Sequence, residues 1–481
     1  MPLKKICLLA ACCYALASYA KDKVITQYGA VSDGKTINTR FIQQAIDEAS
    51  REGGGRVVVP PGNFMTGSLQ LKSGVELHLQ AGACLQGSHS LADYQPVRGR
   101  NALIGADGQE NIAITGEGVL DGQGQELMLD IFMRLRSGEL KSDSIWLYKR
   151  PDVGRALVVC FYACKKIRVN GITLKNASSW VQDYRGCDGL DIHGITVQST
   201  AYWNNDGLDI TDSKNVRVTH CFINAADDAL CLKSSDPKGM CENFYIDSCT
   251  LRSSASGLKF GTANAGGFRN ITVRNLTIFD TYRSAIALES VDGGVMDHID
   301  IQYVKARNTG NAIFIRRGHR NNDARMSTAE NIYIAHVQVE VPFLKPDQGY
   351  PIEGPPDHLR PGIDKMPLRP SSYHIYGHPY LPYNLIPASI VGLPGYPVKD
   401  VVLEDIEITY GGGGDKNIAW IPLDKISTVP ENPAQYPEFS MFGELPAWGF
   451  YIRHAENIQF KHVRIRYQKE DFRPAIVTDD V

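Results

Sequence analysis

The sequence predicts an all-β protein built as a parallel β-helix. Three observations support this prediction: a repeated strand motif, a short repeat period, and almost no helical periodicity after residue 52. The motif is a polar turn followed by alternating β-branched residues, often beside Asn or Asp. Its copies occupy residues 165–176, 188–200, 214–225, 242–254, 269–280, 297–308, 330–341, 399–410 and 456–467.

Through the middle of the chain the copies follow each other at about 23 to 33 residues, a period typical of solenoids. Each copy holds two or three strands that are too short to form a globular sheet alone. Stacked coils would pair these strands and bury a continuous apolar interior. A β-propeller is the alternative, but its blades need roughly 40 to 50 residues each. The parallel β-helix therefore fits the repeat better.

One helix is expected ahead of the coils, over residues 38–51. Glycines 53–55 would end it, and residues 57–59 would begin the first strand. The apolar residues with helical spacing are Phe41, Ile42, Ala45, Ile46 and Ala49.

Two stretches interrupt the repeat. Residues 122–155 have mixed character and are interpreted as a loop or flap. Residues 342–396 are rich in Pro, Gly and Tyr and are far longer than an ordinary connection. Their aromatic content favours an ordered loop over the coil. If both stretches wall off one end of a cleft, a polymer would enter only by its end, which predicts exo-acting attack.

The first 20 residues are typical of an export signal. Lys4 and Lys5 form a charged start, residues 6–16 are apolar, and Ser18-Tyr19-Ala20 fits a small-residue cleavage site. Residues 9–12 also resemble a bacterial lipoprotein site, which we rank lower because the preceding apolar run is very short. We therefore expect an exported protein, periplasmic or extracellular.

The rest of the chain, residues 21–481, is expected to form a single β-helix domain without a membrane span. Apolar residues make up 43% of the 481 residues and charged residues 21%, as in folded soluble proteins. The net charge of −3 shows no basic excess for nucleic acid. Binding of an acidic polymer would then depend on local clusters of Lys and Arg. The sequence makes no prediction of the oligomeric state.

Eleven cysteines are present, and three of them lie in the export signal. Export permits disulfides, and Cys221 with Cys231 and Cys241 with Cys249 are possible pairs. The favoured alternative is that the cysteines are small buried side chains stacked inside the coil. No pair has the spacing of a zinc site, so we expect no metal and no cofactor.

Three carboxylates recur at the same point of neighbouring coils. Asp206 lies in the segment 204–210, and Asp227 and Asp228 lie in 224–234, about one short coil later. Residues one coil apart sit side by side, so we expect these side chains to meet. Hydrolysis between sugars needs a protonated carboxyl at the leaving oxygen and an ionised carboxylate to activate water. Because crowded like charges raise at least one pKa, these residues are the predicted catalytic group.

The segment Asp-Gly-Leu-Asp-Ile occurs twice and provides an internal control. The copy at 206–210 has an Asp-Asp partner one coil later, whereas the copy at 188–192 has none. We therefore interpret Asp188 and Asp191 as turn residues, a common use of Asp in coils.

Nearly all of the chain after the export signal resembles glycoside hydrolase family 28, the polygalacturonases and their relatives. Residues 28–62 resemble the usual start of the family's domain, and residues 67–88 resemble its first coil. The family's Asn-Thr-Asp-Gly segment appears as Asn204-Asn205-Asp206-Gly207, and its Asp-Asp segment as Asp227-Asp228. These two motifs at this spacing are specific, while either alone would be weak.

The resemblance implies a right-handed parallel β-helix that hydrolyses α-linked galacturonic acid, or a related sugar, in an acidic plant polysaccharide such as pectin. It implies an inverting mechanism, for which acid and base stand about 6.5 to 9.5 Å apart. On this analogy Asp228 is the general acid, and Asp206 and Asp227 hold and activate water. Asn205, in the first motif, is a predicted substrate contact.

Two further family segments are not matched. Where the family has Gly-His-Gly, Ser256 replaces the His, and where it has Arg-Ile-Lys, this chain has Ile286-Ala287-Leu288-Glu289. The lost basic residues normally hold the galacturonate carboxylate, so the substrate is in doubt. The residues predicted to compensate are Lys259, Arg283, Arg316 and Arg317. Sugar stacking or simple burial is open for Trp180, Trp203 and Tyr282.

Three alternatives remain open. A hydrolase of another pectic linkage, such as rhamnogalacturonan, would explain the missing Arg and Lys. A calcium-dependent lyase on the same fold could use the aspartates as calcium ligands. A coil that only binds carbohydrate is the least favoured, because three packed carboxylates are costly unless they do chemistry.

Overall fold

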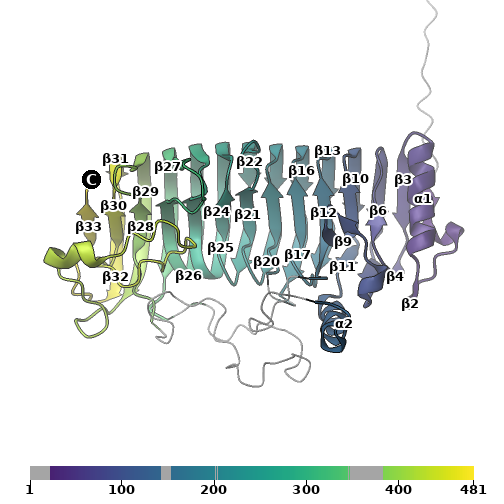
Figure 1. Ribbon diagram of the computed structural model, residues 1–481, viewed down its shortest axis with the longest axis horizontal. Helices are drawn as coiled ribbons and strands as arrows, with labels where there is room; N and C mark the ends of the chain where they lie inside the picture. The colour runs from purple at the N-terminus through teal and green to yellow at the C-terminus, as the bar shows by residue number, and fades with distance from the viewer. Residues whose placement is uncertain (1–21, 142–152, 201, 203, 345, 347–382) are drawn as a thin grey trace, which may run out of the picture.

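The computed structural model describes residues 22–481 except 142–152, 201, 203, 345 and 347–382. The predicted export signal and most of the predicted loop 342–396 lie outside these residues. The described chain forms an elongated coil of stacked parallel strands (Figure 1). The coil is right-handed, the hand expected for parallel strands joined by crossovers. The fold class predicted from the sequence is confirmed.

Three parallel sheets run along the coil, and we name them in the order in which the chain visits them. The first sheet contains β1 (Lys23–Val24), β3 (Gly55–Val59), β6 (Val75–Leu79), β10 (Glu110–Gly116), β13 (Lys165–Asn170), β16 (Asp188–His193), β19 (Lys214–Thr219), β22 (Cys241–Asp247) and β31 (Ala455–Lys461).

The second sheet follows the first within each coil. It contains β2 (Asp33–Ile37), β4 (Gly62–Thr66), β7 (Ala83–Gly87), β11 (Val119–Asp121), β14 (Thr173–Lys175), β17 (Thr196–Ser199), β20 (Phe222–Ala225), β23 (Thr250–Ser253) and β32 (Arg464–Lys469).

The third sheet closes each coil and carries the candidate site. It contains β5 (Leu69–Gln70), β9 (Arg100–Asp107), β12 (Ala156–Tyr162), β15 (Gln182–Arg185), β18 (Leu208–Thr211), β21 (Leu230–Ser234), β24 (Leu258–Asn264), β28 (Ala388–Val391), β30 (Phe450–Arg453) and β33 (Ile476–Asp479). A short strand, β8 (Pro96–Val97), pairs antiparallel with β9.

Four long strands bend from one sheet into the next. β25 (Gly267–Ser290) and β26 (Val295–Arg317) run through all three sheets, and β27 (Glu330–Val341) and β29 (Val398–Gly412) run through the first two. Every predicted copy of the strand motif coincides with strands of the first and second sheets. The copy 330–341, for example, is β27 itself.

Apolar rows fill the interior, because inward-facing residues of successive coils stack at the same register. Burying one such side chain is worth roughly 1.5 to 3 kcal/mol, so the stack stabilises the coil along its whole length. One row of the first sheet consists of Ile167, Leu190, Val216, Phe244, Ile271, Ile299, Ile332 and Val401.

The asparagines of the motif shape the turns into the first sheet. Asn215, Asn243 and Asn270 have positive φ values of 56°, 61° and 54°, a left-handed conformation that Asn tolerates better than most residues. Their side-chain amides donate to the residue one coil earlier. Asn215 donates to Asp188 at 2.7 Å, and Asn243 donates to Asn215 at 3.2 Å.

The helix predicted at 38–51 is α1 (Thr39–Arg51), which lies across the N-terminal end of the coil (Figure 1). Its buried residues Ile42, Ala45, Ile46 and Ala49 close the open end of the apolar interior. Capping of this kind is what a solenoid needs at its ends.

The prediction of a loop over residues 122–155 is wrong in part, because Gly124–Ser137 form the helix α2. Leu127, Ile131 and Phe132 of α2 are buried against Tyr202, four residues before Asp206. The helix therefore supports the segment that carries one predicted catalytic residue. Short 3-10 helices occur at η1 (Ile25–Tyr28), η2 (Leu91–Asp93) and η5 (Leu423–Thr428).

The eight cysteines after the export signal are all free thiols, and seven of them are buried. The favoured expectation of small buried side chains is confirmed, and the alternative disulfide pairs are absent from the described residues. Among the helices of the described residues, none combines the length and apolar character needed to cross a membrane.

Candidate active site

The three predicted carboxylates meet at the turn that enters the third sheet. Asp206 precedes β18 by two residues, and Asp227 and Asp228 precede the neighbouring β21 by three and two residues. One oxygen from each lies within 4.8 Å of one oxygen of the others. All three are buried, with 4%, 8% and 4% of their surface exposed. The predicted convergence of coil neighbours is therefore found in the structure.

The internal control lies apart from the cluster, as expected, but the prediction of a turn is wrong for Asp191, which is an exposed residue inside the strand β16. The first copy of Asp-Gly-Leu-Asp-Ile, residues 188–192, lies on β16, in the first sheet, away from the cluster. Asp188 accepts a hydrogen bond from Asn215 at 2.7 Å and lies 3.5 Å from the ammonium of Lys214. It is thus a turn residue of the coil.

The spacing of the cluster differs from the expectation for an inverting enzyme. Oxygens within 4.8 Å of one another are closer than the 6.5 to 9.5 Å range associated with direct attack by water. The carboxylates are close because the strands that carry them are hydrogen-bonded neighbours. Inversion at the anomeric carbon therefore stays a prediction. The distances between the carboxylate oxygens do not by themselves support it.

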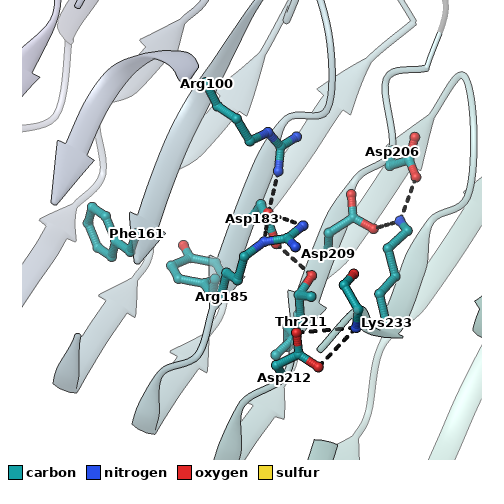
Figure 2. A network of polar contacts seen from close by, with 12 residues as sticks. Arg100, Phe161, Asp183, Arg185, Asp206, Asp209, Thr211, Asp212 and Lys233 are labelled. Atoms are coloured by element: carbon teal, nitrogen blue, oxygen red, sulfur yellow. Dashed lines mark hydrogen bonds and ion pairs between the residues drawn. The ribbon is translucent and has the colours of Figure 1, made fainter. Parts of the chain in front are cut away.

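Asp206 is bound by a buried lysine. Lys233, on β21, donates to Asp206 at 3.0 Å and also binds Asp209 of β18 (Figure 2). Burial raises the pKa of Asp206 well above its ordinary value, and the nearby Asp209, Asp227 and Asp228 raise it further, although Lys233 opposes them. Burial likewise raises the pKa of Asp209 to about 7.

For Asp228, the balance between burial and neighbouring charges is the opposite of that for Asp206. Burial favours its neutral form, but the charges of Lys259, Arg283 and Lys233 outweigh burial and lower its pKa. Lys259 lies 3.1 Å from its carboxylate, and the backbone N–H of Ser256 donates to it at 3.1 Å. The pKa of the residue that the family resemblance implies as the acid is thus lowered, while that of Asp206 is raised.

The side of the cluster toward the N-terminus is called here the N-terminal flank and consists of Arg100, Trp180, Asp183, Arg185 and Asp209. Asp183 binds both Arg100 and Arg185, as Figure 2 shows. The guanidinium of Arg100 also lies 4.3 Å from the ring centroid of Trp180. Both arginines remain partly exposed, at 29% and 21% of their side chains, while Asp183 is buried. This flank therefore contains two arginine side chains that are in part open to solvent.

The opposite side, called here the C-terminal flank, consists of Lys259, Arg283, Glu289, Tyr436 and Glu438. Lys259 lies 3.1 Å from Asp228 and 3.8 Å from Glu289, and Arg283 pairs with Glu438. Burial raises the pKa of Glu289 to about 8 and that of Glu438 to about 7. The cations of this flank are thus matched by acidic groups.

Among the predicted substrate contacts, Lys259 and Arg283 lie beside the cluster, and Asn205 does not face it. Asn205 is fully buried, and its amide donates to the backbone oxygens of Ala177 and Ser179 at 2.9 and 2.7 Å. It therefore has a structural role, in contrast to the contact expected from the sequence.

Arg316 and Arg317 also differ from the prediction. Arg316 donates to the backbone oxygens of Gly392 and Glu431 at 2.8 and 2.7 Å, and it is fully buried. Burial lowers its pKa to about 10. Arg317 donates to the backbone oxygen of Pro397 at 2.6 Å. Both arginines hold loops onto the third sheet instead of facing the cluster.

The aromatic residues predicted to stack on sugars also differ in their surroundings. Trp180 is half-buried beside Lys233, whose ammonium lies 4.0 Å from its ring centroid. Tyr282 is buried and packs on Ala255. Trp203 lies outside the described residues.

The aspartate cluster is the group among the described residues whose acidic ligands could hold a metal ion. Calcium takes six to eight oxygen ligands. Here two of the three carboxylates already bind an ammonium group, Lys233 on Asp206 and Lys259 on Asp228. Two cations in direct contact with the cluster disfavour a third, so the residues do not fit calcium.

Several site residues were missed by the sequence reasoning. Lys233 and Asp209 lie inside the two motifs already singled out, so the same coil spacing could have found them. Tyr436 and Glu438 follow no repeat, and the Tyr436 hydroxyl reaches Lys259 across 177 residues of sequence at 3.3 Å. No sequence signal points to that contact.

The fold is a parallel β-helix, and its site is a cluster of carboxylates between two lysines. Together they are typical of a class of carbohydrate-active proteins. Within that class, residues 50–341 match glycosyl hydrolases family 28, and the chain belongs to this family. The family resemblance stated from the motifs is confirmed.

Curated relatives are polygalacturonases. The chain is 29% identical over 324 residues to a probable polygalacturonase of Vitis vinifera, covering 63% of this chain and 58% of that protein. It is 26% identical to an exo-poly-alpha-D-galacturonosidase of Dickeya chrysanthemi, covering 43% of this chain and 41% of that protein. The chain thus spans about half the length of these two relatives.

Solved structures share the fold. A family 28 exopolygalacturonase of Yersinia enterocolitica aligns with a TM-score of 0.68 at 17% identity, covering 96% of this chain and 78% of that one. An exopolygalacturonase of Thermotoga maritima aligns with a TM-score of 0.60 at 22% identity, covering 81% and 87%.

Proposed function

We propose that this protein hydrolyses glycosidic bonds of a pectic polysaccharide, using Asp206, Asp227 and Asp228. The observation that carries the proposal is the pair of opposite pKa shifts inside one cluster. The pKa of Asp206 is raised by burial, and that of Asp228 is lowered by the neighbouring cations. One protonated and one ionised carboxyl are what glycoside hydrolysis requires.

The chemistry needs a proton at the leaving oxygen and a base for water. As the C–O bond breaks, a carboxyl of the cluster protonates the leaving sugar, and a carboxylate takes a proton from the attacking water. We keep Asp228 as the acid that the family resemblance implies. Because the pKa of Asp228 is lowered in the free enzyme, Asp228 must take up a proton before the bond breaks. The pKa values then belong to the cluster as a unit.

An aryl glycoside of galacturonic acid tests which carboxyl is the acid. A nitrophenolate leaves without protonation, so a variant that lacks only the acid keeps its rate on this substrate and loses it on the polymer. We expect this pattern for Asp228→Asn and loss on both substrates for Asp227→Asn. The reverse pattern, with Asp206→Asn retaining the aryl activity, would assign the acid to Asp206.

Inversion at the anomeric carbon and exo attack are part of the proposal. Proton NMR of the first product distinguishes inversion from retention, and a retained anomer would indicate a covalent intermediate. For exo attack, single sugars should appear from the start on a long polymer while viscosity barely falls. Rapid loss of viscosity with mixed oligomers would show endo attack.

Export to the periplasm or the exterior is proposed from residues 1–20, with lipoprotein anchoring as the less favoured alternative. Mass spectrometry of the protein recovered from cells distinguishes these outcomes. Cleavage after Ala20 supports export by an ordinary signal, whereas a lipid-modified N-terminal cysteine supports anchoring.

A further inference from the structure

We propose that Glu431 is a positioning residue for the carboxylate cluster. It holds residues 430–438, called here the cover segment, against the third sheet. The far end of this segment carries Tyr436 and Glu438, which contact the two cations of the C-terminal flank. The inference rests on the proposed function and extends it to a residue outside the site described above.

The far end of the cover segment reaches the catalytic cluster through two cations. The Tyr436 hydroxyl lies 3.3 Å from the ammonium of Lys259. Glu438 pairs with Arg283. Burial raises the pKa of Asp228, and the charges of Lys259 and Arg283 lower it by more. The position of the cover segment therefore affects how these cations face the residue that the family resemblance implies as the acid.

Burial of apolar side chains does not fix the middle of the cover segment. Residues 430–436 are all exposed or half-buried. The buried apolar residues that pack on strands of the third sheet lie on either side of them, at Val429 and within 439–442. A stretch with few buried apolar contacts opens at a low cost in free energy. Polar contacts must therefore keep this stretch in place.

Glu431 provides such contacts through both its side chain and its backbone. The guanidinium of Arg453, at the end of β30, lies 2.6 Å from its carboxylate, and Nε2 of His454 lies 3.0 Å from the same oxygen. Arg316, on β26, donates to the Glu431 backbone oxygen at 2.7 Å. Hydrogen bonds between charged groups are the stronger ones in proteins. Glu431 thus binds the cover segment to two strands of the third sheet.

The groups that bind the Glu431 carboxylate are themselves held from the other side. Nε of Arg453 lies 3.0 Å from the carboxylate of Asp479 on β33, and Nδ1 of His454 lies 2.6 Å from that of Asp480. Both Arg453 and His454 are buried. Side chains that packing and further hydrogen bonds hold in place give a site its precise geometry. Arg453 and His454 therefore offer Glu431 a fixed seat.

A double-mutant cycle on polymer hydrolysis tests the inference. If Glu431 acts through the far end of the segment, Glu431→Gln and Tyr436→Phe should each lose about tenfold in kcat/KM, and the double variant little more than either. Both variants should also shift the limb of the pH–rate profile that Lys259→Met shifts, because they disturb the cation beside Asp228. Losses that multiply in the double variant would overturn the inference, and so would an unchanged rate of Glu431→Gln.

Hydrogen exchange tests the hold of Glu431 apart from catalysis. In Glu431→Gln the amides of 430–438 should exchange faster, while those of β28 and β30 exchange as before. His454→Gln removes one of the two side-chain contacts and should act in the same direction, which serves if Glu431→Gln folds poorly. Unchanged exchange of the cover segment in both variants would overturn the inference.

The matched control is Glu407→Gln, which removes another glutamate that faces an arginine. Glu407 lies 3.7 Å from Arg466 on the second sheet, away from the cover segment. This variant should change neither the rate nor the exchange of the segment. Lack of hydrolysis by the unaltered protein would overturn the proposed function, whereas faster exchange in Glu431→Gln would still support the hold of Glu431 on the segment.

Discussion

Two buried lysines flank the carboxylate cluster, and their surroundings differ. Lys233 divides its charge between Asp206 and Asp209 on the N-terminal side, and the pKa of Asp206 is still raised by burial. On the C-terminal side Lys259 acts on Asp228 together with Arg283, and the pKa of Asp228 is lowered. All of these aspartates are buried, so burial alone does not decide the direction of each pKa shift. The balance of positive and negative charges around each carboxylate decides it.

The comparison extends to the outer parts of the two flanks. The arginines of the N-terminal flank, Arg100 and Arg185, are partly exposed, whereas Lys259 and Arg283 of the C-terminal flank are paired with buried acids. The predictions below test this contrast, beginning with the largest expected effect.

Asp228→Asn should reduce hydrolysis of the polymer by about two to four orders of magnitude, the usual worth of general acid–base assistance. Because Asp228 is buried against Lys259, we also expect a lower melting temperature. Rates and thermal unfolding of the variant and of the turn variant Asp188→Asn check both points. Activity close to that of the unaltered protein would remove Asp228 from the mechanism.

Lys259→Met and Lys233→Met should separate the two flanks by their pH–rate profiles. Without Lys259 the pKa of Asp228 rises, and without Lys233 the pKa of Asp206 rises further, because each ammonium favours the ionised form of its neighbour. We expect each variant to lose about tenfold or more in kcat/KM and to shift a different limb of the profile. Identical shifts in the two variants would show that the cluster does not distinguish its flanks.

Glu289→Gln should change how stability depends on pH. The folded-state pKa of Glu289 is raised from 4.5 to about 8. Its contribution to the free energy of unfolding is therefore fully present below pH 4.5 and is lost as the pH rises through about 8. The stability of the unaltered protein relative to the variant should fall across this window, by up to a few kcal/mol at roughly 1.4 kcal/mol per pKa unit. Denaturant unfolding at several pH values measures this difference, and a rise with pH would contradict the prediction.

A chelator should have the smallest effect. Because Lys233 and Lys259 already bind the carboxylates, EDTA should change the rate by less than about twofold, and products should not absorb as unsaturated sugars do. Ultraviolet absorbance and product masses check this outcome. Strong chelator sensitivity together with unsaturated products would favour a calcium-dependent lyase.

Local spacing in the sequence predicted the coil, the helix α1 and the meeting of three aspartates. A β-helix converts a separation of one repeat into direct adjacency, so residues such as Asp206 and Asp228 can be placed together from their numbers alone. The same logic separated the first copy of Asp-Gly-Leu-Asp-Ile, which lies on another sheet. The two aspartate motifs then indicated glycoside hydrolase family 28.

Only the tertiary structure decided what surrounds that cluster. Coil spacing does not say which loop covers a face, so Glu438 and Tyr436 were not foreseeable, and neither was the helix α2. The spacing of the repeats also gave wrong predictions for Arg316 and Asn205. Both side chains donate hydrogen bonds to backbone oxygens, Arg316 to Gly392 and Asn205 to Ala177, and neither faces the cluster. The order of the aspartate pKa values depends on the number of cations packed around each, a property of the assembled fold.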